Sequence, residues 1–307
     1  MNDGSIAMRH RLTLLGVTAA ALLAGSILGI PGTPAPARAE ALAPNPAMRT
    51  LAYGPDPLQQ LDFYPPQDPK ASRAPLVVFV HGGGWKRGSR TMDRGSLKQR
   101  HLTAQGYAFA SLDYRLVPAA RVEDQAADIA TALRVLIDRA AALGIDPKRI
   151  VLMGHSAGAH LVALVGTDAS YLKGAGLSPR DLAGIVPIDG AAYDVPAQMS
   201  DGPRIMQQTY RQAFGTDPAR QRALSPTLQA AAPNAPRFLL LHVMRPDGAR
   251  QGEALEKALR AGGTNVAREG FAGTGLAGHM EINRRLGDPG YAPTVALDGF
   301  LRTAFAR

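Results

Sequence analysis

One serine of the chain lies between glycines in a setting that favours nucleophilic chemistry. Residues 154–158 read Gly-His-Ser-Ala-Gly, after an apolar run at residues 150–153 and before a helical-looking stretch at residues 157–165. A strand, then Gly-x-Ser-x-Gly, then a helix is the context of a nucleophile elbow. A turn this sharp strains the backbone at the serine, and small neighbours avoid clashes there. The serine would also lie at the N-terminal end of the helix, where free backbone amides favour negative charge that develops during a reaction. We therefore interpret Ser156 as a nucleophile.

A nucleophilic serine needs a general base, and two histidines follow the predicted elbow helix. His242 lies inside the apolar run at residues 239–243, which is typical of a core or strand-end residue. His279 follows the glycine-rich stretch at residues 273–278 and precedes a predicted polar helix at residues 280–286. A position past the last strand lets a side chain reach back over the sheet edge. We predict His279 as the base; the alternative is a histidine of a surface loop.

The base in turn needs a carboxylate that orients it and stabilises the imidazolium. Asp247 follows the predicted strand at residues 238–243, and Pro246 and Gly248 beside it favour a fixed turn. We predict Asp247 as this acid, although aspartate is also common in ordinary turns. Asp189, directly after the preceding strand, is the alternative, and Glu253 is a weaker one.

Three consecutive glycines at residues 82–84 follow a buried-strand pattern and precede Trp85. Glycine allows backbone amides to approach a substrate oxygen closely. We predict that the amides of Gly83, Gly84 and Ala157 form an oxyanion hole. A flexible loop is the alternative, and a phosphate-binding loop is disfavoured because no Lys-Ser/Thr pair follows.

Side chains near these groups are candidates for contact with a substrate. We predict that Trp85, His155 and Tyr193 line the substrate pocket, together with the region of residues 199–214.

Strands and helices alternate along the chain and predict an α/β fold. A hairpin is expected within residues 41–66, and buried-strand patterns occur at residues 75–80, 107–112, 150–153, 183–188 and 238–243. Helices are expected at residues 96–105, 122–143, 253–259 and 293–305, with Gly144 ending the second. Such alternation predicts a mostly parallel sheet flanked by helices. Residues 189–236 have no strand pattern and are predicted to form a small cap of short helices.

Three motifs resemble those of a known family. They are His-Gly-Gly-Gly-Trp at residues 81–85, Asp-Tyr-Arg-Leu at residues 113–116 and Gly-His-Ser-Ala-Gly at residues 154–158. Together they resemble the hormone-sensitive-lipase-like carboxylesterase branch of the α/β-hydrolase fold. The chain is also similar in these motifs to feruloyl and acetyl-xylan esterases and to kynurenine formamidases.

The resemblance implies an α/β-hydrolase fold with Ser156, Asp247 and His279 as the triad and no metal or other cofactor. It also matches Gly83, Gly84 and Ala157 to the oxyanion donors. The sequence departs from the family at residues 245–249, where Arg-Pro-Asp-Gly-Ala stands in place of the usual Asp-x-x-Val-Pro.

The composition restricts the class of protein and its partners. The chain of 307 residues has a net charge of +9, but its basic residues are scattered, so no nucleic-acid partner is expected. It contains no cysteine, which excludes disulfides, a thiol nucleophile and cysteine-bound metal.

The N-terminal segment resembles a signal peptide. Arg9 and Arg11 precede an uncharged, mostly apolar stretch at residues 12–30, and Ala-Arg-Ala at residues 37–39 fits a cleavage site. We predict a signal peptide at residues 1–39 and a secreted or periplasmic catalytic domain at residues 40–307. The alternative is an uncleaved membrane anchor.

The sequence as a whole predicts an exported serine hydrolase that cleaves small-molecule carboxylic esters through an acyl-enzyme on Ser156. The same groups could serve an arylformamidase or small amidase. An inactive binding module on the same fold is the third alternative. The acyl specificity and the oligomeric state are left open by the sequence.

Overall fold

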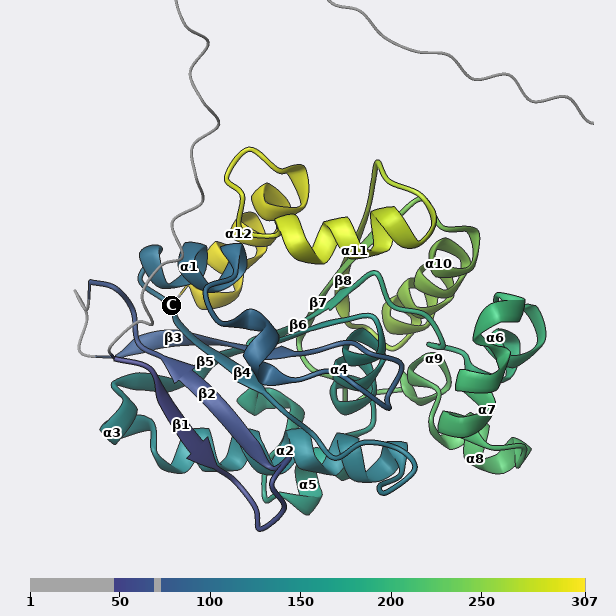
Figure 1. Cartoon of the computed structure of the whole chain (residues 1–307), viewed down its shortest axis with the longest axis horizontal. Coiled ribbons are helices and arrows are strands. Elements are labelled where there is room, and N and C mark those ends of the chain that lie inside the picture. The colour runs from purple at the N-terminus through teal and green to yellow at the C-terminus, as the bar shows by residue number, and fades with distance from the viewer. Residues whose placement is uncertain (1–46, 69–72, 307) are drawn as a thin grey trace, which may run out of the picture. The chain divides into compact units, whose positions relative to one another are not determined.

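A mixed, mostly parallel sheet organises the computed structural model, which describes residues 47–68 and 73–306 (Figure 1). Its eight strands lie in the order β1-β2-β4-β3-β5-β6-β7-β8. The first two pairings of this order, β1 with β2 and β2 with β4, are antiparallel, and all the others are parallel. The strands are β1 (Arg49–Ala52), β2 (Gln60–Tyr64), β3 (Ala74–Val80), β4 (Ala108–Leu112), β5 (Ile145–His155), β6 (Gly184–Ile188), β7 (Arg237–Val243) and β8 (Asn265–Phe271).

The central strands are short apolar runs because both faces of the sheet are covered. Every residue of β3, β4 and β6 is buried, as is expected for parallel strands between two helical layers. The edge strand β8 differs, since only Val266 of its seven residues is buried. The sequence patterns did not predict β8, because a half-exposed edge strand of the sequence Asn-Val-Ala-Arg-Glu-Gly-Phe has no continuous apolar run.

Helices cover both faces of the sheet and form two hydrophobic cores. One core contains side chains of α2 (Val122–Asp138), α4 (Ala157–Thr167) and α10 (Pro246–Ala261). The other contains side chains of α1 (Leu97–Ala104), α11 (Gly275–Arg285) and α12 (Ala292–Phe305). Figure 1 shows α1, α11 and α12 on the side of the strands opposite α2. The shorter helices on these faces are η1 (Arg90–Asp93), α3 (Ala140–Leu143), α5 (Ala169–Gly174) and η2 (Pro179–Asp181).

The segment predicted to form a cap contains short helices and no strand, as expected. These are α6 (Val195–Asp201), η3 (Arg204–Met206), α7 (Gln207–Phe214), α8 (Pro218–Ala223) and α9 (Pro226–Gln229). The helix expected at residues 122–143 is interrupted at Arg139, and Gly144 ends it with a left-handed φ of 68°. Two helices begin earlier than the sequence indicated, since α10 starts at Pro246 and α11 at Gly275.

The described residues all belong to one compact unit of the chain. The predicted signal peptide at residues 1–39 lies outside them. No helix in the described part of the chain combines the length and the apolar character needed to cross a membrane.

Candidate active site

Ser156 lies at a sharp turn between β5 and α4, as the motif predicted. Its φ of 58° and ψ of −118° are strained for a residue with a side chain. The flanking glycines are required by close contacts, because a Cβ on Gly154 would lie 2.4 Å from the carbonyl oxygen of Gly158. A Cβ on Gly158 would lie 2.2 Å from the carbonyl oxygen of Val80. The turn therefore brings the serine hydroxyl to the carboxyl edge of the parallel sheet, at the start of α4.

A continuous hydrogen-bonded chain joins Ser156, His279 and Asp189. Nε2 of His279 lies 3.0 Å from Oγ of Ser156, and Nδ1 lies 2.6 Å from Oδ2 of Asp189. Asp189 directly follows β6, and His279 lies on α11, which follows β8. The carboxyl ends of β5 and β6 meet at the same edge of the sheet, so these groups are close although they are far apart in sequence.

The surroundings of Asp189 keep its carboxylate ionised. Its side chain is fully buried, and burial opposes the charge. The hydrogen bond with His279, the charge of Arg245 and the amide of Val243 outweigh burial, so the pKa of Asp189 lies below its usual value. An ionised carboxylate can only accept, so Nδ1–H of His279 donates to it. The lone pair of Nε2 then faces the hydroxyl of Ser156, as a general base requires.

Asp247, predicted as the acid, does not occupy the position beside His279. It lies in the first turn of α10, where its Oδ2 accepts from Nε2 of Gln198 at 3.3 Å. Arg245 lies 3.8 Å from the same Asp247 oxygen, and the contact with His279 is made by Asp189 instead. The reason is local: Pro246 starts a helix, which turns Asp247 away from the sheet edge. The signal available in the sequence was that Asp189 follows its strand directly, whereas Asp247 follows a helix-starting proline.

The glycine loop after β3 lies against the serine turn. A Cβ on Gly82 would lie 2.9 Å from the carbonyl oxygen of His155 and 3.0 Å from Cβ of Ser156. Gly83 and Gly84 have φ values of 122° and 63°, which favour glycine. Within the described residues, the amides of Gly83, Gly84 and Ala157 donate no hydrogen bond to another protein group.

An aromatic cluster supports this loop from the protein side. Trp85, predicted to line the pocket, is only 3% exposed and packs against Tyr210 and Phe214 of α7. Its Nε1–H donates to Nδ1 of His160 at 3.3 Å, and Nε2–H of His160 donates to the carbonyl oxygen of Leu224 at 2.9 Å. Burial lowers the pKa of His160 to about 4, so this imidazole is neutral. The cluster thus links the glycine loop with α4, α7 and the backbone at Leu224.

Two other residues predicted to line the pocket are also buried. Tyr193 is 3% exposed, and its hydroxyl occupies the space that a Cβ on Gly190 would need. His155 is 4% exposed, and its Nε2–H donates to the carbonyl oxygen of His279 at 2.9 Å. Burial, followed by the charge of His279, lowers the pKa of His155 to about 3. The neutral His155 therefore anchors the backbone of the candidate base through this hydrogen bond, and the two imidazole rings lie 4.5 Å apart.

A buried ionic network fixes the polar residues around the glycine loop. Arg90 binds Asp62 through Nε at 3.0 Å and also pairs with Asp113. His81, the first residue of the loop motif, stacks on Tyr114 with ring centres 4.4 Å apart. These contacts are structural and lie on the protein side of the loop.

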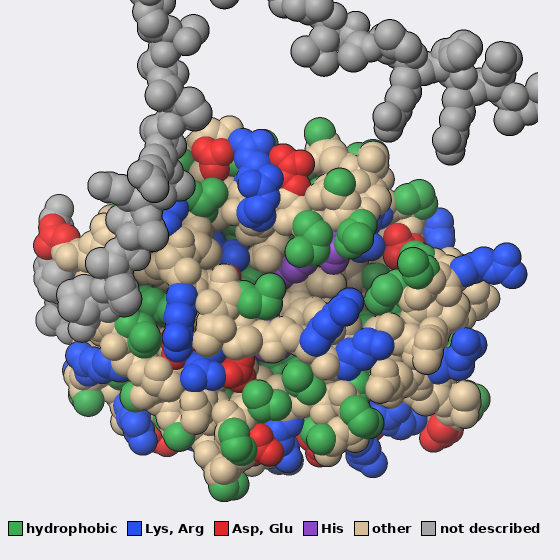
Figure 2. All heavy atoms as spheres, in the orientation of Figure 1, with side chains coloured by type: hydrophobic (Ala, Val, Ile, Leu, Met, Phe, Trp, Pro, Cys, Tyr) green, Lys and Arg blue, Asp and Glu red, His purple; other side chains and the backbone are tan. Residues whose placement is uncertain are grey.

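Exposed apolar side chains lie on α11, which carries the candidate base, and on the segment after β7 that is hydrogen-bonded to its start. Leu276 and Met280 of α11 are 74% and 48% exposed. Met244, which follows β7, is 59% exposed, and its amide donates to the carbonyl oxygen of Gly273 at the start of the α11 segment. We call Met244, Leu276 and Met280 the apolar rim. Figure 2 shows histidine side chains beside hydrophobic ones near the centre of the drawn face.

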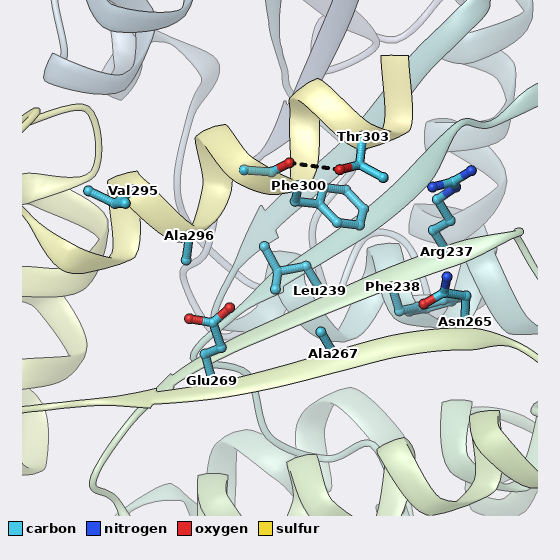
Figure 3. Close-up of a pocket in the computed structure, with 11 residues that line it drawn as sticks. Arg237, Phe238, Leu239, Asn265, Ala267, Glu269, Val295, Ala296, Phe300 and Thr303 are labelled. Carbon is cyan, nitrogen blue, oxygen red and sulfur yellow. Dashed lines mark hydrogen bonds between the residues drawn. The ribbon is translucent and has the colours of Figure 1, made fainter. Parts of the chain in front are cut away.

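A separate groove lies away from these catalytic candidates. It has a volume of about 310 Å³ and is formed by β7, β8 and α12, as Figure 3 shows. Phe300 and Leu239 face it, whereas Ser156, Asp189 and His279 do not line it. Among the residues that the structure describes, no group of three or more His, Asp or Glu side chains could hold a metal ion.

The sheet order and the serine turn after β5 define an α/β-hydrolase fold. The BD-FAE family model matches residues 61–177, which include the glycine loop and the serine turn. Esterase LipC of Mycobacterium tuberculosis (strain ATCC 25618 / H37Rv) is 32% identical over 208 residues, 64% of this chain and 50% of LipC. The probable isoprenylcysteine alpha-carbonyl methylesterase ICME of Oryza sativa subsp. japonica is 39% identical over 116 residues, 38% of this chain and 27% of that protein.

A solved structure agrees with these matches. Thermogutta terrifontis esterase Est2 with bound butyrate has a TM-score of 0.63 at 25% identity, covering 84% of this chain and 92% of Est2. The chain spans only half or less of the length of the two relatives named above. The predicted resemblance is confirmed: the chain has an α/β-hydrolase fold, it is similar to esterases, and its residues 61–177 match the BD-FAE family model.

Proposed function

We propose that the protein hydrolyses carboxylic esters through an acyl-enzyme on Ser156. The single observation that carries this proposal is the hydrogen-bonded chain from Ser156 through His279 to the buried Asp189. The relation to esterases supports the same reaction class. We assign the role of the triad acid to Asp189, because it makes the contact with His279 that the mechanism requires.

The mechanism has two steps with the same groups. Oγ of Ser156 attacks the ester carbonyl carbon while Nε2 of His279 takes the hydroxyl proton. The carbonyl oxygen becomes an oxyanion that accepts from the amides of Gly83, Gly84 and Ala157. The imidazolium then gives its proton to the leaving alcohol, and the acyl group stays on the serine. In the second step water attacks the acyl carbon while Nε2 of His279 takes its proton, and the imidazolium then returns that proton to Oγ of Ser156 as the carboxylic acid is released.

A variant of the nucleophile tests the proposal. The purified chain and Ser156→Ala are assayed with nitrophenyl esters from acetyl to lauroyl, with feruloyl esters and with formyl-kynurenine. Ser170→Ala is the matched control, because Ser170 is an exposed serine on α5. We expect Ser156→Ala to lose at least about a thousandfold in kcat while the control keeps full activity. Equal rates for the wild type and Ser156→Ala on every ester would refute the proposal. Cleavage of formyl-kynurenine alone would indicate an arylformamidase.

We infer that the substrates have an apolar part that lies on the apolar rim. The exposed Met and Leu side chains of the rim adjoin the candidate base, and methionine adapts its shape to different apolar groups. Replacing Leu276 by Asp should lower kcat/KM for long acyl esters about tenfold more than for acetyl esters. Equal losses for all acyl lengths would contradict this role.

We further propose that the enzyme acts outside the cytoplasm after cleavage of residues 1–39. The positive residues, apolar stretch and Ala-Arg-Ala sequence of the N-terminus support export. N-terminal sequencing of the protein from fractionated cells tests this proposal. A new N-terminus at Glu40 in the secreted or periplasmic fraction is expected, and an intact N-terminus in the cytoplasmic fraction would contradict it.

A further inference from the structure

Arg245 contacts the carboxylate of Asp189, which accepts the hydrogen bond from His279. The proposed mechanism gives Arg245 no role. Its Nε lies 2.9 Å from Oδ2 of Asp189, the same oxygen that His279 approaches at 2.6 Å. The Nε–H is not directed at an acceptor, so this contact is an attraction between charges and not a hydrogen bond. The side chain of Arg245 is only 16% exposed, so solvent screens this attraction weakly.

The backbone around Arg245 holds the guanidinium in place. Its Nη2 donates to the carbonyl oxygens of Asp189 and Gly190 at 3.2 and 3.4 Å. A Cβ on Gly248 would lie 3.1 Å from Nη2, so the glycine leaves the space that the guanidinium occupies. The carboxylate thus comes from the end of β6 and the cation from the end of β7, so that each strand contributes one charge.

We propose that Arg245 is a positioning residue of the triad, which holds the Asp189 carboxylate against His279 and sets the pH range of catalysis. The inference rests on the proposed ester hydrolysis. A guanidinium beside the shared oxygen offsets part of the carboxylate charge that His279 experiences. A variant without this guanidinium would leave the whole carboxylate charge facing His279, so the acid limb of its pH–activity profile should lie at higher pH than in the wild type.

Other charged or titratable groups face the Asp189–His279 pair from the surrounding elements. His155 of β5, Tyr193 and Tyr291 interact with the pair directly, and behind them Lys98 interacts with His155, Asp247 with Arg245, and Glu281 and Arg285 with Tyr291. Of these, Asp247 lies 3.8 Å from Nη1 of Arg245 and partly offsets its charge. The structure therefore predicts opposite effects for removal of the two charges.

The experiment measures kcat/KM for a short-chain nitrophenyl ester from pH 5 to pH 9. In Arg245→Gln, the pH at which half of the activity is lost on acidification should rise by about half to one unit. In Asp247→Asn, the same midpoint should fall slightly and kcat should stay within about threefold of wild type. Arg245→Lys keeps the charge and should keep the wild-type midpoint even if its kcat falls.

A second measurement makes the test independent of ester hydrolysis. The pH titration of the His279 ring protons is followed by NMR in the same four proteins, with Arg268→Gln of β8 as a charge-matched control. A raised midpoint in Arg245→Gln, with none in Arg268→Gln, supports the proposal even if no ester is cleaved. Identical midpoints in wild type, Arg245→Gln and Arg245→Lys would overturn it and leave Arg245 as a structural residue only. Failure of Arg245→Gln to fold would leave the opposite shift in Asp247→Asn as the deciding result, and its absence would also overturn the proposal.

Discussion

Replacement of Asp189 by Asn tests the proposed triad most directly. The change removes a fully buried charge and keeps the volume of the side chain. The hydrogen bond between this carboxylate and Nδ1 of His279 is 2.6 Å long and lies out of solvent. Because the acceptor is ionised, this hydrogen bond is strong. Removing one partner of such a buried pair costs about 3 to 5 kcal/mol. Most of this cost should raise the free energy of activation, because the imidazolium forms in the transition state.

At about 1.4 kcal/mol for each tenfold change in rate, the expected loss in kcat is about 10²- to 10⁴-fold. The asparagine amide can also donate to Nδ1, which would leave the proton of His279 on Nε2 and block proton transfer from Ser156. The assay is kcat and KM on a short-chain nitrophenyl ester, with the fold checked by circular dichroism. KM should change little, since Asp189 has no exposed surface with which to bind substrate.

Asp247→Asn is the matched control for this change, because it neutralises the other candidate carboxylate. Its kcat should remain within about threefold of the wild-type value, as for most changes outside the reacting groups. A loss of more than about a hundredfold in Asp247→Asn, with Asp189→Asn nearly active, would refute the assignment of the acid.

Three further changes follow from the site. His155→Phe replaces the imidazole by another aromatic ring and removes the donor to the carbonyl oxygen of His279; kcat should fall about tenfold, and unchanged kinetics would show that this anchor is unimportant. Gly82→Ala places a Cβ 2.9 Å from the carbonyl oxygen of His155 and should lower kcat about a hundredfold by displacing the oxyanion donors, while an active variant would place the hole elsewhere. The pKa of His160 is lowered by burial, so the folded state excludes a proton that the unfolded chain binds below about pH 6.5. Stability should therefore fall by up to about 1.4 kcal/mol per pH unit between about pH 6.5 and pH 4, and urea unfolding of His160→Gln should show a shallower dependence.

The fold was largely predictable because its central strands carry their own signal. Buried parallel strands are continuous apolar runs, and the helices between them have regular apolar spacing, so the order of elements follows from local patterns. The strand β8 was missed because an edge strand with one buried residue lacks that pattern. The start of α11 was misjudged because its first turn contains Gly275 and Gly278, which usually indicate a loop.

The sequence by itself determined the serine turn, the glycine loop and the candidate base of this protein. Each depends on a local motif. The strained turn at Ser156, for example, requires glycine at positions 154 and 158. Only the tertiary structure decided which carboxylate meets His279. Asp189 and Asp247 both follow strands that end at the same sheet edge, and the difference between them is the direction in which the chain leaves that edge. That direction depends on the packing of α10 and on Arg245, contacts between segments that no local pattern records.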